Sequence, residues 1–189
     1  MAIHIMGDLE TLSTTHSAAV VQMGFVSWDS LTNNRHTFKR NISFDDAMRH
    51  GEVSGDTLAW WFKQSDEARE SITDKELLVS SEEAVGQLEE FLKGVMEKSP
   101  RHVHFWSHAS FDAPILVNLF KSHGKEFPIP FYKFRDLRTI DYLACKVADK
   151  IPREGTHHDA LDDAQYQMDC LIDKLQKVKE KLEWENSDV

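Results

Sequence analysis

Two acidic residues close to the start of the chain, Asp8 and Glu10, have types and a spacing that could do chemistry. They follow the apolar run IHIM, which predicts a strand, and residues two apart in a strand point to the same side. Two carboxylates on one side repel each other unless a cation lies between them, which makes the pair a candidate metal site. Taken alone, an acid pair of this kind more often marks the polar end of an edge strand that faces water.

The second feature is Asp112, which ends the segment HFWSHASFD, where an apolar strand-like run gives way to the start of a helix. Read by itself, this aspartate is as typical of a helix N-cap as of a functional site. The same segment brings Phe111 next to the acid.

The third feature is HHDALDDAQ, in which His158 precedes Asp163 by five residues. Five residues on a continuous helix turn two side chains about 140° apart, so they meet at one site only if His158 lies in the loop before the helix. The segment IPREGT supplies such a loop. Asp159 and Asp162 are interpreted as ordinary acids of a helix first turn, where the helix dipole favours them.

Taken in order, DLET, SFDAP, DLRTIDYL and HHDALDDA resemble the motifs of the DEDDh exonuclease group within the ribonuclease H-like superfamily. The resemblance covers almost the whole chain. Within the group, DLETLST, the tryptophan pair in TLAWWFKQS and the compact length are most similar to the phage exonuclease A proteins and the RNase AS type of 3′-exoribonuclease.

This resemblance implies a catalytic set of Asp8, Glu10, Asp112, His158 and Asp163. The four acids would hold two divalent cations, Mg²⁺ or Mn²⁺, because hard cations prefer carboxylate oxygens. In that arrangement Asp8 contacts both ions, and neutral His158 acts as general base. The implied reaction removes nucleoside 5′-monophosphates from the 3′ end of single-stranded DNA or RNA; which sugar is used stays open.

Residues beside these motifs are expected to contact the substrate: Thr11, Leu12, Phe111, Trp61 and His108. The adjacent residues Trp60 and Trp61 diverge by about 100° on a helix, so at most one faces the substrate and the other packs inward. Arg138 is expected to pair with a neighbouring acid, Asp136 or Asp141, rather than with phosphate.

Gly7 departs from the family pattern, which usually has an apolar branched residue before the first aspartate. A glycine here indicates either a close approach to another backbone or a damaged site.

The elements that must position these residues form an α/β pattern, with strands first and helices later, which predicts a ribonuclease H-like mixed sheet flanked by helices. Strands are expected at 4–6, 18–28, 36–42 and 103–106, the first three as an antiparallel meander, with helices at 54–72, 80–98, 113–121 and 137–148. An apolar stripe from Leu161 to Leu182 predicts a long last helix. We expect one domain over residues 1–182 and a polar, frayed tail over 183–189.

The composition bounds the class of protein. Cys145 and Cys170 lack zinc or disulfide spacing, and no export segment or membrane span is indicated, so a cytoplasmic protein is expected. The net charge of −10 argues against binding nucleic acid by bulk electrostatics, unless bound cations supply local positive charge. The resemblance, and no residue of the chain, points to a homodimer.

Two other classes of function compete with the exonuclease. One is a ribonuclease H-like module that binds nucleic acid without chemistry, although a retired site has no need of mutually repelling acids. The other is a metal-dependent phosphatase or nucleotide hydrolase that acts on a small substrate.

Overall fold

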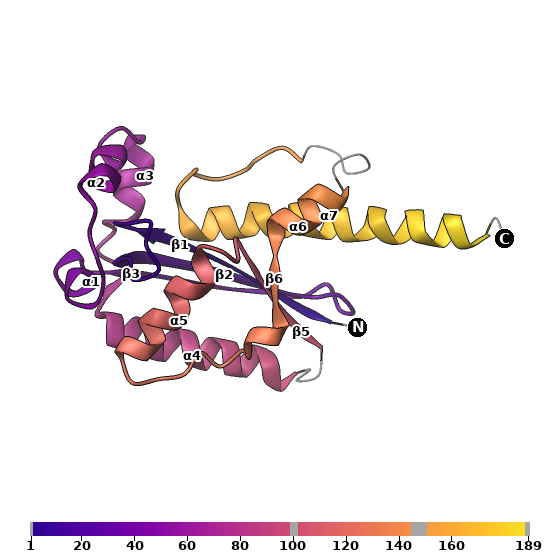
Figure 1. Ribbon diagram of the computed structural model, residues 1–189, viewed down its shortest axis with the longest axis horizontal. Coiled ribbons are helices and arrows are strands. Elements are labelled where there is room, and N and C mark those ends of the chain that lie inside the picture. Colours follow the sequence, from indigo (N-terminus) through magenta and orange to yellow (C-terminus); the bar gives the residue numbers. More distant parts are fainter. Residues whose placement is uncertain (1, 99–101, 145–150, 188–189) are drawn as a thin grey trace.

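The computed structural model describes residues 2–98, 102–144 and 151–187 and shows a six-stranded mixed sheet between two helical layers (Figure 1). The strand order is β4-β3-β2-β1-β5-β6. Strands β1 to β3 form an antiparallel meander, whereas β5 runs parallel to β1 and β6 runs parallel to β5. The α/β fold with a mixed sheet and flanking helices, predicted from the sequence, is therefore confirmed.

The bounds of the elements are as follows. The strands are β1 Ile3–Thr11, β2 Val20–Asp29, β3 Arg35–Ile42, β4 Leu78–Val79, β5 Val103–Ser107 and β6 Phe134–Asp136. The helices are α1 Phe44–His50, α2 Gly55–Trp61, α3 Asp66–Ser71, α4 Ser81–Glu97, α5 Asp112–Ser122, α6 Leu137–Ala144 and α7 Ala160–Ser187, and a 3₁₀ turn covers Phe131–Lys133.

The central strand β1 is buried along its whole length, and its alternate residues serve opposite faces of the sheet. Ile5 and Leu9 belong to the larger core, which α4 and α5 cover on the lower side of Figure 1. Met6 belongs to a smaller core under α6 and α7. Asp8 and Glu10 continue the Met6 side of the strand, which directs them towards α7.

Two glycines let neighbouring atoms come close to the backbone of β1 and β2, and these contacts help to position the site. A side chain at Gly7 would lie 2.4 Å from the Phe25 ring and 2.9 Å from the Phe105 ring, so this position is filled by stacked aromatic rings. A side chain at Gly24 would lie 2.1 Å from the backbone of Ala160. Because Gly24 pairs with Asp8 in the sheet, this contact brings the start of α7 against the strand that carries the acids.

Several sequence predictions need correction. The single helix expected at 54–72 is two short helices, α2 and α3, because the chain turns at 62–65 and Ser65 caps α3. The tail expected to fray from residue 183 is helical to Ser187, since its run of helix-forming residues contains no glycine or proline to end the helix. Short elements α1, β4 and β6 were not predicted, and the last part of the helix expected at 137–148 lies outside the described residues.

Candidate active site

Four of the predicted acids come together from three elements. Asp8 and Glu10 lie on β1, Asp112 is the first residue of α5, and Asp163 is in the first turn of α7. Carboxylate oxygens of Asp8, Glu10 and Asp163 all lie within 4.8 Å of one another. All four acids are buried, and they line a cavity of about 430 Å³.

Burial and mutual repulsion make the ionised form of several of these acids unfavourable. Loss of hydration raises the pKa of Asp8 well above its ordinary value, and the nearby Asp112 raises it further. Glu10 has a raised pKa for the same reasons, with Asp8 as its main repelling neighbour. Burial raises the pKa of Asp112 to about 7, although the backbone N–H of His108 donates to its Oδ2 at 2.9 Å. Such a cluster is a favourable place for cations.

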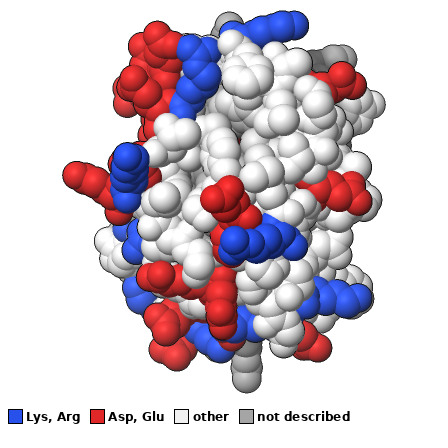
Figure 2. All heavy atoms as spheres, turned by 90° about the vertical axis from the view of Figure 1, so that its left-hand side faces the viewer, with Lys and Arg blue, Asp and Glu red and all other residues white. Residues whose placement is uncertain are grey.

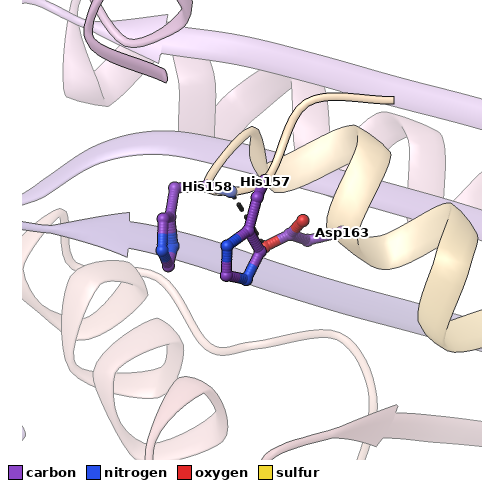
Figure 3. A group of neighbouring side chains, drawn as sticks. All are labelled: His157, His158 and Asp163. Atoms are coloured by element: carbon purple, nitrogen blue, oxygen red, sulfur yellow. Dashed lines mark hydrogen bonds between the residues drawn. The ribbon is translucent and has the colours of Figure 1, made fainter. Parts of the chain in front are cut away.

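His158 lies in the loop before α7, as the five-residue spacing requires. Its φ of 66° is in the left-handed region, which is uncommon for a residue with a side chain. The His158 N–H donates to Asp163 at 3.3 Å, and the two imidazoles of His157 and His158 are neighbours (Figure 3). The His158 Nδ1 lies 4.0 Å from a Glu10 oxygen. Burial, with help from His157 and Arg153, lowers its pKa to about 4, so the ring is neutral at pH 7.

Two polar residues of the site were missed from the sequence. Arg153 forms an ion pair with Asp163 and stacks on the Tyr166 ring at 4.8 Å, and Gln167 donates to Asp8 Oδ1 at 2.8 Å. The position of Gln167 four residues after Asp163, on the same face of a helix, was a usable signal. Arg153 lies in a segment without helix or strand periodicity, so its contact could not be foreseen.

Asp159 and Asp162 position the loop and the helix start. Asp159 accepts from the backbone N–H groups of Leu161 and Asp162, and its other oxygen pairs with Lys39 and Ser71. Asp162 accepts from the Thr156 N–H at 2.7 Å. The interpretation as a first-turn acid holds for Asp162, whereas Asp159 precedes α7 and caps it. Asp159 is also 5% exposed and tied to β3.

A second cavity, of about 440 Å³, adjoins the acids and contains some of the expected substrate contacts. It is lined by Glu10, Thr11, Trp60 and Phe111 among others. The Trp60 ring is 40% exposed and lies edge to face with the His158 ring at 4.7 Å.

Two predicted substrate contacts are placed elsewhere. Trp61 is the inward member of the pair: it is 5% exposed and its Nε1 donates to the Thr11 carbonyl. Leu12 is 2% exposed in the core, and its N–H and carbonyl bond to Ala19 and Ser54. The exposed Trp60, and not the predicted Trp61, lines the second cavity, because the hydrogen bond between Trp61 and Thr11 turns Trp61 inward.

The surroundings of Asp112 differ from expectation at Arg138. This arginine donates to Ser110 Oγ at 3.2 Å, while Asp141 pairs with Lys174 at 2.5 Å. The Arg138 side chain therefore contacts the loop before α5, and its link to Asp136 is a hydrogen bond from its backbone N–H at 3.0 Å where an ion pair was expected. His108 lines the cavity as predicted, and burial lowers its pKa.

The surface beside the site is not dominated by charge of one sign. On the side formed by α1, α2 and α3, basic and acidic side chains are interspersed around broad areas without charge (Figure 2). Within the described parts of the chain, no helix combines the length and apolar character needed to cross a membrane.

Comparison with known proteins decides the family. Residues 3–173 match the model of the 3′-5′ exoribonuclease Rv2179c-like domain. The chain belongs to this family. The chain is also similar to an exodeoxyribonuclease of Enterobacteria phage T4, with 27% identity over 154 residues, which covers 70% of this chain and 67% of that protein. Both matches support the 3′-5′ exonuclease group that the sequence motifs indicated.

Residues of this Rv2179c-like domain fit divalent cations by the chemistry of their donors. Carboxylate oxygens are the ligands that Mg²⁺ and Mn²⁺ prefer, and here three buried acids present them within 4.8 Å. Burial and then the repulsion of neighbouring carboxylates raise the pKa of Asp8 and of Glu10, and a bound cation would offset both effects. Asp8 and Asp112 form a further group with His108, whose possible ligand atoms also lie within 4.8 Å of one another.

Proposed function

We propose that this protein is a 3′→5′ exonuclease that hydrolyses the terminal phosphodiester bond of single-stranded nucleic acid with two divalent cations. The observation that carries the proposal is the convergence of four buried acids from β1, α5 and α7 in one open cavity of a chain that belongs to an exoribonuclease family. Membership supports nuclease activity, and the acid cluster supports dependence on metal.

The acids would hold the ions in two groups. Asp8 belongs to both groups, of which one contains Glu10 and Asp163 and the other contains Asp112 beside His108. When bound, divalent cations stabilise the negative charge on the phosphoryl and leaving oxygens and make water more acidic. The carboxylates contribute position and charge only, and all four are held by regular secondary structure or its first turn.

His158 acts as the general base in this proposal. A neutral ring can accept a proton from water, and an anionic phosphate beside it raises its pKa towards the range useful at pH 7. The ring stands between His157 and Trp60, which fix its orientation, and beside Glu10. The left-handed backbone at residue 158 directs the ring to the acids.

The cavity lined by Thr11, Trp60 and Phe111 is proposed to receive the 3′-terminal nucleotide. It shares Glu10 with the acid cluster, so a nucleotide bound there has its phosphate next to the carboxylates. Trp60 and Phe111 offer aromatic surface to any base, which suits an enzyme with little sequence preference.

The test is digestion of single-stranded RNA and DNA labelled at the 3′ or the 5′ end, with Mg²⁺, Mn²⁺ or EDTA. Release of the 3′ label as a mononucleotide, dependent on metal, is the expected result, and the faster substrate assigns the sugar. Absence of cleavage combined with retained oligonucleotide binding would favour the inert binding module. Hydrolysis confined to free nucleotides would favour the small-substrate hydrolase.

A further inference from the structure

We propose that Arg153 is a phosphate-binding residue that occupies Asp163 while no divalent cation is bound and is released to the substrate when cations bind. The inference rests on the proposed function, because it assigns a further residue to the same site.

Arg153 lies at the cavity that contains the acids. Its guanidinium pairs with Asp163 and lies over the Tyr166 ring at 4.8 Å. The arginine side chain is 30% exposed, whereas that of Asp163 is 11% exposed, so the arginine reaches inward from the rim. It is thus a cation in contact with one of the proposed metal ligands.

Binding of a divalent ion at Asp163 must weaken this ion pair. The carboxylate oxygens of Asp163, Asp8 and Glu10 lie close enough to share one ion. A guanidinium keeps its charge at all relevant pH values, so it is repelled by a cation on the same carboxylate. Metal binding and the Arg153–Asp163 pair therefore compete.

Once released, Arg153 is suited to phosphate. Its planar group can donate two parallel hydrogen bonds to a phosphate, and the Tyr166 ring supports the guanidinium face. Among described residues that line the cavity, the other lysine or arginine is Lys174, whose Nζ is engaged by Asp141 at 2.5 Å. Since basic and acidic groups are interspersed on the adjoining face (Figure 2), phosphate recognition depends on individual cations such as this one.

The loop that carries Arg153 allows this change without refolding. Residues 151–154 form neither helix nor strand, whereas the next residues are fixed to α7. The Thr156 N–H donates to Asp162, and Gly155, at φ 81°, lies directly against the Asp162 side chain. The anchor after Arg153 keeps its base near the site while the long side chain turns.

The first experiment measures metal affinity without substrate or turnover. Mn²⁺ is titrated into the wild type, Arg153→Gln and Arg153→Lys, and free Mn²⁺ is followed by electron paramagnetic resonance. Removal of the competing charge should tighten Mn²⁺ binding about 2- to 10-fold in Arg153→Gln. Arg153→Lys keeps the charge and should stay near the wild type.

A matched control is Arg35→Gln. Arg35 also pairs with an aspartate of α7, Asp169, at 2.6 Å, but this pair lies outside the cavity. The control removes the same formal charge and should leave Mn²⁺ affinity unchanged. Equal tightening in both variants would reduce the effect to net charge and overturn the proposal.

The second experiment tests phosphate recognition. Fluorescence anisotropy measures binding of oligonucleotides whose 3′-terminal linkage is a charged phosphorothioate or a neutral methylphosphonate. With Mg²⁺ the wild type should prefer the charged linkage by about 10-fold, and Arg153→Gln should lose most of this preference. In EDTA the wild type should show little preference, because Arg153 is then held by Asp163.

The outcomes separate this inference from the proposed function. If the wild type binds Mn²⁺ and degrades RNA or DNA from the 3′ end, but Arg153→Gln changes neither metal affinity nor linkage preference, only the role of Arg153 is rejected. If the wild type neither binds Mn²⁺ in the cavity nor cleaves, the proposed function itself is rejected.

Discussion

Asp159 and the buried acids of the candidate site lie close to the start of α7, and they differ in how their charge is balanced. Asp159 has Lys39, the Ser71 hydroxyl and two helix N–H groups as partners. Asp8 and Glu10 instead have other carboxylates as neighbours. Burial is similar, since Asp159 is 5% exposed and Asp8 is 8% exposed. Charge balance, not burial, therefore separates an acid that holds the fold from acids arranged for cations.

The pKa directions express the same difference. Burial by itself would raise the pKa of Asp159, but hydrogen bonds from Lys39 and Ser71 outweigh it, and the pKa is lowered. Burial raises the pKa of Asp112 to about 7 because its backbone donors compensate only in part.

The largest expected effect is on turnover after neutralisation of a site acid. Asp8→Asn or Glu10→Gln should lower the rate of digestion by about 10³-fold or more, since each removes a ligand on which several kcal/mol of charge stabilisation depends. In EDTA the same variants should have a free energy of unfolding about 1–2 kcal/mol above that of the wild type, and therefore a higher melting temperature, because a repelling charge is gone. A large fall in melting temperature for both would contradict a role confined to the site.

A smaller loss is expected at His158, which is proposed to move a proton and not to hold an ion. His158→Ala should reduce the rate about 10²-fold while Mn²⁺ affinity stays close to the wild type. His158→Asn is the control for backbone strain, because asparagine tolerates a φ of 66°. Undiminished digestion by both variants would remove His158 from the role of base.

Much of the fold could be predicted because it rests on local periodicity. The two-residue spacing of Asp8 and Glu10 after an expected strand predicted that they share a side, and the structure directs both to α7. The spacing of His158 and Asp163 required a loop before the last helix, and α7 begins at Ala160. The short strands β4 and β6 could not be found, since strands of two and three residues carry too little pattern.

The contacts that tune the site depend on tertiary packing and were therefore not predictable. The choice between Trp60 and Trp61 follows from how α2 lies on β1, and the sequence specified only that the two rings diverge. For Gly7 the alternatives were a close approach to another backbone and a damaged site, and the structure instead shows a close approach of side chains, the rings of Phe25 and Phe105. The partners of Asp159 are 88 and 120 residues away in the chain.

For Asp159, whose charge is balanced within the fold, the change Asp159→Asn should reduce the stability of the protein more than the rate of digestion. The change leaves Lys39, whose side chain is 19% exposed, without its carboxylate and should cost about 3 kcal/mol in the free energy of unfolding. Urea denaturation measures this, and digestion per folded molecule should fall far less than for Asp8→Asn. Asp66→Asn is the control, because its pair with Arg69 is at the surface and should cost at most about 1 kcal/mol. A loss of activity without a loss of stability would place Asp159 among the site acids.

The smallest expected effect, and the sharpest contrast, is in the pH dependence of stability without metal. The Asp112 pKa is about 7 in the folded protein against an ordinary 3.8, so between these values the folded state binds more protons there than the unfolded chain. The free energy of unfolding therefore falls as pH rises through this window. His4 and His158, with pKa values lowered to about 4, contribute the opposite slope up to about pH 6.5.

Comparison of each variant with the wild type cancels the histidine contribution. In EDTA, the stability advantage of Asp112→Asn should grow by on the order of 1–2 kcal/mol from pH 4 to pH 7. For Asp159, whose pKa is lowered in the folded state, the wild type gains from ionisation above the ordinary pKa, so the cost of Asp159→Asn should shrink as pH falls. Urea denaturation at several pH values measures both differences. The stability of the variant relative to the wild type should rise with pH for Asp112→Asn and fall with pH for Asp159→Asn. A change in the same direction for both would remove the distinction between an acid that serves the fold and an acid arranged for cations.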